Sequence, residues 1–328
     1  MRVVRFLLLA SGVVLFAALL INIGPGAVVQ SFAHLSWSLL LILWFPFVLV
    51  TLFDTLGWRY AFSRDRVPFR ALLSTRMAGE AFNATTPTAS VGGEGVKTWL
   101  LRGHVSVGES LTSVVVAKTT ITIAQMLFLV VGVIAGPSLL PADSKLIPVM
   151  YWMLVIEVVA VGGFVLVQVS GMLDRLGRAL AGVGLPHEGA QTLRGLDESL
   201  VAFYRREPRR LLLSTLCHFL GWAFSAFEVY VILYFLDAPV PLLTAILIEA
   251  VGTGVRFASF MIPAHVGALE GGYVATFLAL GLDPATALSF GLTRRLREAA
   301  WVGLGFLLAR EPQTPARAPA ALAAEQDA

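Results

Sequence analysis

The sequence contains little charge and a single cysteine. Only 14% of its 328 residues are charged, 57% are hydrophobic, and the mean hydropathy is +0.80. Soluble domains carry about a quarter charged residues, so this composition excludes a soluble globular protein and predicts an integral membrane protein. The lone cysteine, Cys217, excludes a disulfide within the chain and any cysteine-based metal cluster.

Motifs typical of hydrolytic, metal-dependent and nucleotide-dependent enzymes are also missing from the sequence. It contains no HExxH motif, no nucleophile elbow and no cluster of Cys and His. The segment GGEGVKT, residues 92–98, resembles a phosphate loop, but Val96 interrupts the required Gly-Lys-Ser/Thr and no strand precedes it. We therefore expect no enzyme activity, no cofactor, no metal site and no nucleic-acid partner.

Long hydrophobic runs are abundant, and about 20 apolar residues suffice for a helix to cross a bilayer. The first run follows two arginines as in a signal peptide, but it is long enough to span and no cleavage site follows, which predicts an uncleaved helix. The sixth run contains a charged group, LTRRLRE, whose side chains cost about 2.5–3.5 kcal/mol each at a helix centre and so need a reason. The predicted spans are about Phe6–Ile23, Leu35–Trp58, Glu109–Gly136, Leu146–Val169, Leu211–Leu236 and Ala285–Ala309.

The connections differ in their content of basic residues. Gly171–Arg210 is rich in arginine, whereas Asn22–His34 contains no Lys or Arg. The positive-inside rule then places the N-terminus, the Arg-rich segment and the C-terminus in the cytoplasm, for a chain in a bacterial-type inner membrane. We interpret residues 1–310 as one transmembrane domain and the Ala/Pro-rich residues 311–328 as a disordered cytoplasmic tail.

Two further segments, Ala71–Arg102 and Leu242–Gly281, are broken near their middle by proline and glycine. Each half is too short to cross a hydrocarbon core of about 30 Å. Broken elements at membrane depth persist only when they are buried in protein or line a wet cavity. These segments therefore predict two re-entrant helical hairpins.

The two broken segments share one pattern at a constant spacing. The span after each of them also begins with a predicted N-cap, at Ser106 and at Asp283. Because three spans separate the hairpins, one hairpin enters from each side, which predicts an inverted-topology repeat with halves about 1–136 and 146–310 and a substrate site near the midplane. Coincidence is the alternative explanation for the spacing. Each matching pair lies 176 residues apart (263 − 87 = 176): Pro87 and Pro263, Glu94 and Glu270, Gly95 and Gly271, Lys118 and Arg294.

The hairpin tips and the cations near them suit a phosphate on a lipid headgroup. Helix N-termini present backbone N–H groups to anions, and glycines let the backbone approach a ligand closely. The candidate substrate-binding residues are Asn83, Pro87, Gly92, Gly93, Glu94, Lys97, Lys118, Arg256, Pro263, Gly267, Glu270, Gly271, Arg294 and Arg295.

The intramembrane carboxyl groups have two possible roles. Burial favours the protonated form of a carboxyl group, which makes four of them candidates for proton coupling. Alternatively they form structural ion pairs: Glu94 with Lys118, Glu270 with Arg294, and the mid-span carboxylates with nearby arginines. The coupling candidates are Glu94, Glu157, Glu228 and Glu270.

These residues also carry a resemblance to a known family. GEAFNATTPTASVGGEGVKTWLLRG, residues 79–103, and EAVGTGVRFASFMIPAHVGALEGGYVATFLALGL, from Glu249, resemble the two signatures of the lysylphosphatidylglycerol synthase transmembrane-domain family, the flippase-like proteins. The pattern is similar to its hopanoid-biosynthesis-associated branch, and the likeness runs over about Arg2–Arg310. The resemblance implies a lipid translocator. Some members add a soluble aminoacyl-transferase domain, which this sequence does not contain up to Ala328, so we expect no synthase activity.

Together these observations predict a flippase-like transporter that moves an anionic lipid, a prenyl-phosphate-type lipid or a hopanoid between leaflets. The alternative is a non-transporting scaffold that docks lipid-pathway enzymes through the Arg-rich segment 171–210. The expected partners are a membrane lipid and, for the scaffold, those enzymes. The sequence does not predict an oligomeric state.

Overall fold

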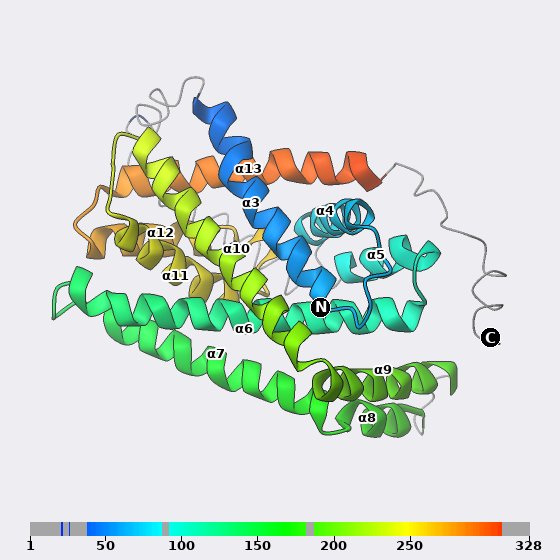
Figure 1. Ribbon diagram of the computed structural model, residues 1–328. Coiled ribbons are helices and arrows are strands. Elements are labelled where there is room, and N and C mark those ends of the chain that lie inside the picture. The colour runs from blue at the N-terminus through cyan, green and yellow to red at the C-terminus, as the bar shows by residue number, and fades with distance from the viewer. Residues whose placement is uncertain (1–20, 22–25, 27–37, 87–91, 182–186, 310–328) are drawn as a thin grey trace.

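A computed structural model describes residues 38–86, 92–181 and 187–309, together with positions 21 and 26 (Figure 1). Within these ranges the chain is built from helices and contains no strand. The predicted first span lies almost wholly outside the described residues, as do positions 87–91 and the tail 311–328. The predicted class is confirmed: the protein is an all-α, polytopic membrane protein.

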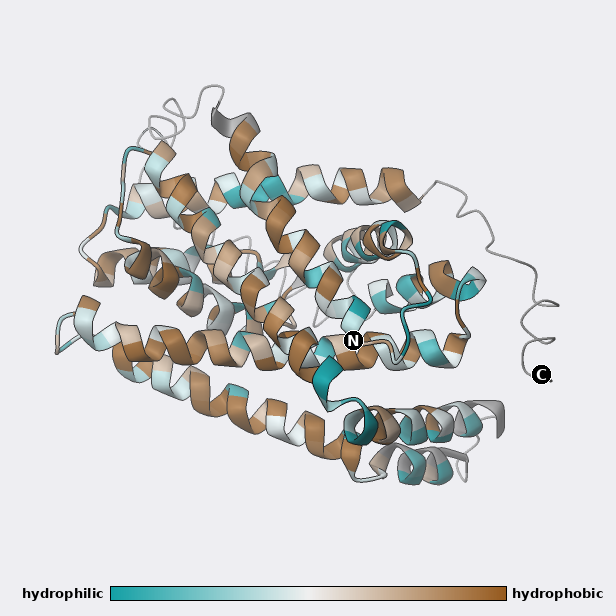
Figure 2. Ribbon diagram, in the orientation of Figure 1, coloured by the Kyte–Doolittle hydropathy of each residue, from teal (hydrophilic) through white to brown (hydrophobic). Residues whose placement is uncertain are grey.

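Among the described residues, four helices are long and apolar enough to cross a membrane, and they match four of the six predicted spans. Hydrophobic residues dominate them, as Figure 2 shows. The sixth predicted span forms α13 (Pro284–Ala309), which is equally long but carries the charged group. The four apolar helices are α3 (Ser38–Tyr60), α6 (Val107–Leu139), α7 (Leu146–Val169) and α10 (Pro208–Phe235).

Two pairs of shorter helices occupy the segments predicted to be hairpins. The first pair is α4 (Phe69–Thr85) and α5 (Gly92–Leu100), followed by the short η1 (Leu101–Gly103). In the second pair, η2 (Pro263–His265) lies between α11 (Leu242–Ala258) and α12 (Ala268–Ala279). Helices of at most 17 residues rise about 25 Å, less than the hydrocarbon core. The two pairs lie toward opposite ends of the molecule in Figure 1.

The helix starts repeat the spacing seen in the sequence. Helices α5 and α12 begin 176 residues apart (268 − 92 = 176), and α6 and α13 begin 177 apart (284 − 107 = 177). Both predicted caps are formed: the Ser106 hydroxyl accepts a bond from the Glu109 N–H at 3.2 Å, and the Asp283 carboxylate accepts one from the Thr286 N–H at 2.9 Å.

The core joins the two halves of the chain. Helices α3 and α10 lie side by side and pack along their lengths, and α13 packs against α4. The Trp301 Nε1–H of α13 donates to the Leu43 carbonyl at 2.8 Å, and its ring contacts Phe47 edge-on at 5.0 Å between centroids. These contacts hold the charged helix α13 between α3 and α4, so its arginines face the middle of the bundle.

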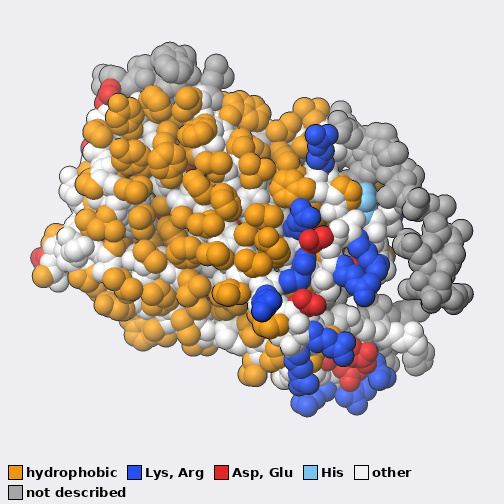
Figure 3. Space-filling view, in the orientation of Figure 1, with side chains coloured by type: hydrophobic (Ala, Val, Ile, Leu, Met, Phe, Trp, Pro, Cys, Tyr) orange, Lys and Arg blue, Asp and Glu red, His pale blue; other side chains and the backbone are white. Residues whose placement is uncertain are grey.

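Charged side chains gather at one end of the molecule. Figure 3 shows hydrophobic side chains over most of one face and Lys, Arg, Asp and Glu at the end where α8 (Met172–Ala181) and α9 (His187–Arg206) lie. The buried Leu200 and Phe203 attach α9 to the bundle. This end contains the Arg-rich segment that the positive-inside rule assigns to the cytoplasm.

Candidate functional site

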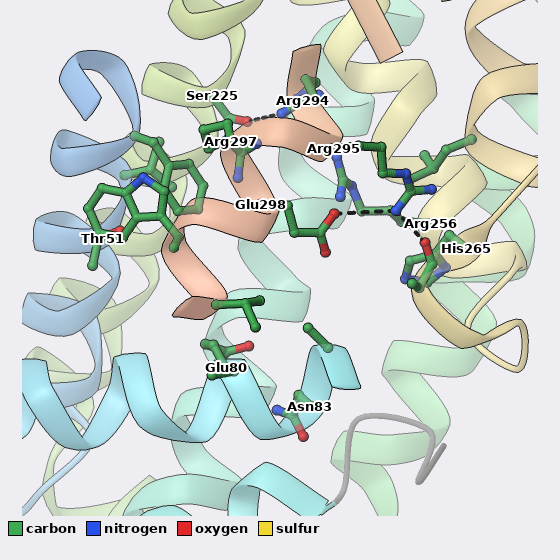
Figure 4. Close-up of a pocket in the computed structure, with 18 of the residues that line it drawn as sticks. Thr51, Glu80, Asn83, Ser225, Arg256, His265, Arg294, Arg295, Arg297 and Glu298 are labelled. Carbon is green, nitrogen blue, oxygen red and sulfur yellow. Dashed lines mark hydrogen bonds and ion pairs between the residues drawn. The ribbon is translucent and has the colours of Figure 1, made fainter. Parts of the chain in front are cut away.

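A cavity of about 340 Å³ lies between α3, α4, α10, α11, α12 and α13 (Figure 4). Charges inside a membrane-crossing bundle are costly unless they are paired or hydrated. The partners of the charged residues that line this cavity therefore decide what it can bind. These residues are Arg76, Arg256, Arg294, Arg295 and Arg297 among the cations, and Asp54, Glu80, Glu270 and Glu298 among the anions.

Arg294 is the centre of a buried network. Its Nη1 donates to Glu249 Oε2 at 2.6 Å and to the Tyr273 hydroxyl at 3.0 Å. Its Nη2 donates to Ser225 at 2.9 Å and to Glu228 at 3.1 Å. Glu228 and Glu249 are each 0% exposed. The guanidinium thus joins α10, α11 and α12 to α13 through charge-assisted bonds, which are the strong class of hydrogen bond.

Arg297 binds both oxygens of the same carboxylate. Its Nε donates to Glu228 Oε1 at 2.8 Å, and its guanidinium stacks on the Phe47 ring at 3.7 Å. Residues three apart on a helix share a face, so Arg294 and Arg297 both turn toward α10. Of the two roles predicted for Glu228, proton coupling or pairing with arginines, the structure shows the pairing.

Arg295 turns to a different neighbour. Its Nε donates to Glu270 Oε1 at 2.9 Å, and its Nη1 donates to the Ala264 carbonyl at 2.6 Å. The second oxygen of Glu270 accepts the Gly267 N–H at 2.8 Å and so closes the start of α12. Gly267 has a φ of +77°, a conformation that glycine adopts without strain. One carboxylate thus ties the tip of the second helix pair to α13.

The ion pair predicted for the second motif is therefore wrong by one residue in its arginine partner. Glu270 pairs with Arg295, not with Arg294. Consecutive residues on a helix point about 100° apart, and Arg295 is the one that faces α12. The N–H group of Gly267 at this tip is already bonded to Glu270, so it is not an open anion site.

The first motif forms its own ion pairs. The Lys97 ammonium lies 2.7 Å from Glu80 and 3.1 Å from Glu94, both on the α4–α5 pair. The predicted partner of Glu94, Lys118, is exposed on α6 and lines a smaller cavity of about 110 Å³ with Lys97. Glu94 takes Lys97 because that residue lies one turn away on the same short helix.

Asn83 holds the two helices of the first pair together. Its Oδ1 accepts the Gly93 N–H at 2.7 Å, and its amide donates to Glu94 at 3.3 Å. A Cβ on Gly93 would lie 2.0 Å from the Gly79 carbonyl oxygen, so only glycine fits at this crossing. The expected close backbone approach is present here, and it serves helix packing.

Several residues of the site were not among the sequence candidates, and three of them, Arg76, Glu80 and Tyr273, make contacts that shape the cavity. Arg76 donates to Asp54 at 2.6 Å, which pairs a mid-span carboxylate of α3 with α4. Glu80, four residues further on α4, is 49% exposed in its side chain and lies at the cavity. Tyr273 offers its hydroxyl to two arginines. The i, i+4 spacing of Arg76 and Glu80 within an apolar hairpin could have identified these two residues from the sequence. Nothing in the sequence indicated Tyr273.

Several guanidinium N–H groups in the cavity wall have no partner among the described residues. The buried nitrogens Arg256 Nε, Arg294 Nε and Arg295 Nη2 make no hydrogen bond. Among the described residues Arg256 also has no carboxylate within ion-pair distance, and its Nη2 donates to the Tyr273 hydroxyl at 3.4 Å. Buried donors without acceptors are costly, so this wall of the cavity favours an anionic oxygen.

The remaining candidates lie elsewhere or outside the described residues. Pro87 falls in the segment 87–91, and Gly92 begins α5. Pro263 is in η2, and Gly271 lies in the first turn of α12. Glu157, on α7, does not line the cavity.

Comparison with protein families gives one match, to the model described as "Lysylphosphatidylglycerol synthase TM region", over residues 3–305. Comparisons with curated proteins and with solved structures give no match. The match extends over both motif regions and over every helix of the cavity except the last few residues of α13.

Proposed function

Because the chain belongs to the lysylphosphatidylglycerol synthase TM region family, we propose that it is a flippase-like transporter of an anionic, prenyl-phosphate-type or hopanoid lipid. The family ties the chain to membrane lipids. One observation carries the rest of the proposal: a cavity inside a hydrophobic bundle has five arginines in its wall, some with unsatisfied N–H groups.

The free donors suit a phosphate. Arg256 and Arg295 both line the cavity, and each keeps a guanidinium nitrogen without an acceptor among the described residues. Planar guanidinium groups bind phosphate oxygens in a bidentate manner. The other arginines are fixed by carboxylates and shape the wall. Arg256 and Arg295 would therefore contact the headgroup directly.

The apolar part of the wall suits the lipid tails. Phe260 and Met261 line the cavity and are also exposed on the surface of the molecule. A lipid whose headgroup enters at the arginines can keep its tails in the bilayer past these residues. This division of the lining supports a substrate that is polar at one end and apolar at the other.

The two helix pairs supply access from both sides. Both line the same cavity, α4 through Arg76 and Glu80, and α11 with α12 through Arg256 and Glu270. They lie toward opposite ends of the molecule (Figure 1), and the helix starts repeat at nearly constant spacing. We interpret them as the re-entrant hairpins of an inverted repeat, with the basic end in the cytoplasm.

A scaffold for lipid-pathway enzymes is the second candidate. The charged helices α8 and α9, which carry arginines of the segment 171–210, project beyond the bundle and offer a docking surface (Figure 1). A scaffold has no need of a charged intramembrane cavity, so replacing cavity arginines would leave its function intact. Replacing the arginines of α8 and α9 would abolish it.

The test is translocation of labelled lipid in liposomes that contain the purified protein. Wild-type protein should move a fluorescent anionic phospholipid or prenyl phosphate faster than empty liposomes do. Arg256→Ala should slow this about 10-fold or more, because a hydrogen bond to a charged group is worth about 1.5–3 kcal/mol. Arg178→Ala, at an exposed position on α8, is the matched control and should transport normally. No transport of any anionic, prenyl-phosphate or hopanoid lipid by the wild type contradicts the proposal.

A further inference from the structure

Glu157 is a buried carboxyl group in the helix that is otherwise most exposed to lipid. It lies 11 residues after the start of α7 (157 − 146 = 11), about 17 Å along the helix and so near its middle. Its neighbours Trp152, Val155, Ile156 and Val159 are exposed, whereas Glu157 is 0% exposed. The side chain therefore points inward, away from lipid, at mid-membrane depth.

Its contacts satisfy only one of its two oxygens. Oε1 accepts a hydrogen bond from the Gln125 amide of α6 at 2.9 Å, and the same amide nitrogen lies 3.3 Å from the Thr253 carbonyl of α11. Oε2 is buried and has no partner among the described residues. No Lys or Arg of this part of the chain forms an ion pair with Glu157, unlike Glu228 and Glu249.

The helices that pack against α7 supply no compensating cation. These are α6, α8, α9 and α11. On α11, Glu249 is bound to Arg294, and Arg256 contacts Tyr273. The other charged or titratable residues of the described parts of these helices are Glu109 and Lys118 on α6, Asp174, Arg175 and Arg178 on α8, and His187, Glu188, Arg194, Asp197, Glu198, Tyr204, Arg205 and Arg206 on α9.

A proton fits this site better than a metal cation. A hard cation needs several oxygen ligands, but Gln125 presents its NH₂ group to both neighbouring oxygens and so acts as a donor. A carboxylate buried without a cation carries a large desolvation cost, which protonation removes. A protonated Oε2 is the form that this environment stabilises.

We infer that Glu157 is a proton-binding site that couples proton movement to lipid transport, an inference that rests on the proposed function. Gln125 links it to Thr253, three residues before Arg256 on α11, so the carboxyl group is hydrogen-bonded through Gln125 to a helix that lines the headgroup cavity. In each cycle Glu157 takes up one proton from one side and releases it to the other. No bond in the lipid is formed or broken.

Infrared difference spectroscopy tests proton binding without any transport. At neutral pH the reconstituted wild type should show the carbonyl stretch of a protonated carboxyl group. Glu157→Gln should lose this component, and Glu198→Gln, at an exposed position on α9, should keep it. Gln125→Leu should keep the band and move it to higher frequency, because the carbonyl loses a donor. Identical bands in all four proteins overturn the inference, and so does a Gln125→Leu band that does not move.

Transport under an imposed pH gradient tests coupling. Wild-type protein should move labelled lipid at a rate that depends on the direction of the gradient, and Glu157→Gln should lose that dependence while it still exchanges lipid downhill. If the wild type shows the carboxyl band but no transport, the proposed function fails and the proton site stands. If transport ignores the gradient, coupling through Glu157 is refuted and the proposed function stands.

Discussion

The two motif regions of this protein contain matching residues, but the ion pairs around them differ in how deeply they are buried. Around α13, Arg294 binds two carboxylates that are completely buried. Around α5, a lysine binds two carboxylates, and one of them, Glu80, is half exposed toward the cavity. The arginine network of the second region is buried and joins four helices, and we call it the closed network. The lysine network of the first region is partly exposed and joins two helices, and we call it the open network.

This difference distinguishes a rigid part of the cavity wall from a part that can move. Buried charge networks held by several charge-assisted bonds favour one arrangement and are costly to open. The Lys97 ammonium is buried, but its partner Glu80 is half exposed, so this pair costs less to open than one between fully buried groups. If the protein transports lipid as proposed, we expect α10–α13 to form the fixed wall of the cavity and α4 and α5 to be the helices that change position.

The largest expected effect comes from removing the shared carboxylate of the closed network. Glu228→Ala leaves Arg294 and Arg297 short of a partner, and breaking a buried pair in this way costs about 3–5 kcal/mol. Glu80→Ala is the matched change in the open network and should cost about 1 kcal/mol or less, since Lys97 keeps Glu94. Thermal unfolding in detergent measures both, and equal losses would contradict the distinction.

The crossing of α4 and α5 should be the next most sensitive feature. Gly93→Ala places a Cβ against the Gly79 carbonyl and should destabilise by about 1–3 kcal/mol through overpacking. Gly95→Ala, two residues further on the same helix, meets nothing within 4 Å and should be neutral. Unfolding temperature and lipid transport should fall together in the first variant. A Gly93→Ala protein as stable as Gly95→Ala would show that α4 and α5 can move apart at their crossing without loss of stability.

Arg295→Lys should impair transport more than stability. A lysine can keep the charge pair with Glu270, but it cannot also present a planar fork to the Ala264 carbonyl and to a phosphate. Transport should fall about 10-fold, equivalent to about 1.4 kcal/mol. Initial rates at saturating and limiting lipid provide the measurement, and unchanged rates would remove Arg295 from the headgroup site.

The smallest effect on stability is expected for Asp65, in the loop after α3. Burial acts to raise the pKa of Asp65, but its bond to Arg210 and the charges of Arg210 and Arg59 lower the pKa below 3.8 overall. A lowered folded-state pKa means that the pair stabilises the fold above about pH 4 and that this stability is lost as the pH falls through the folded pKa. Because Asp65 is partly exposed, Asp65→Asn should cost less than about 1 kcal/mol at pH 7, and the cost should shrink as the pH falls through the folded pKa. A larger effect at low pH than at pH 7 would have the wrong sign.

The sequence predicted the elements of the fold better than their partners. Composition and run length identified the apolar spans, and Pro87 and Pro263 marked both breaks, because lipid penalises polar backbone and proline interrupts helices. The predicted pairing of Glu270 was wrong because the adjacent residues Arg294 and Arg295 face different helices, and that of Glu94 was wrong because Lys97 lies one turn away on the same helix. The spacing of Arg76 and Glu80 was visible in the sequence, but the partner of Arg76 and the role of Tyr273 arise from packing between different segments of the chain.

Native mass spectrometry of co-purified lipid most directly tests the claim that the arginine-lined cavity binds an anionic headgroup. We predict that the wild-type protein retains an anionic lipid, that Arg256→Gln loses most of it, and that Arg178→Gln retains it. Neutral lipids alone on the wild type, or equal anionic lipid on the wild type and Arg256→Gln, would contradict the claim.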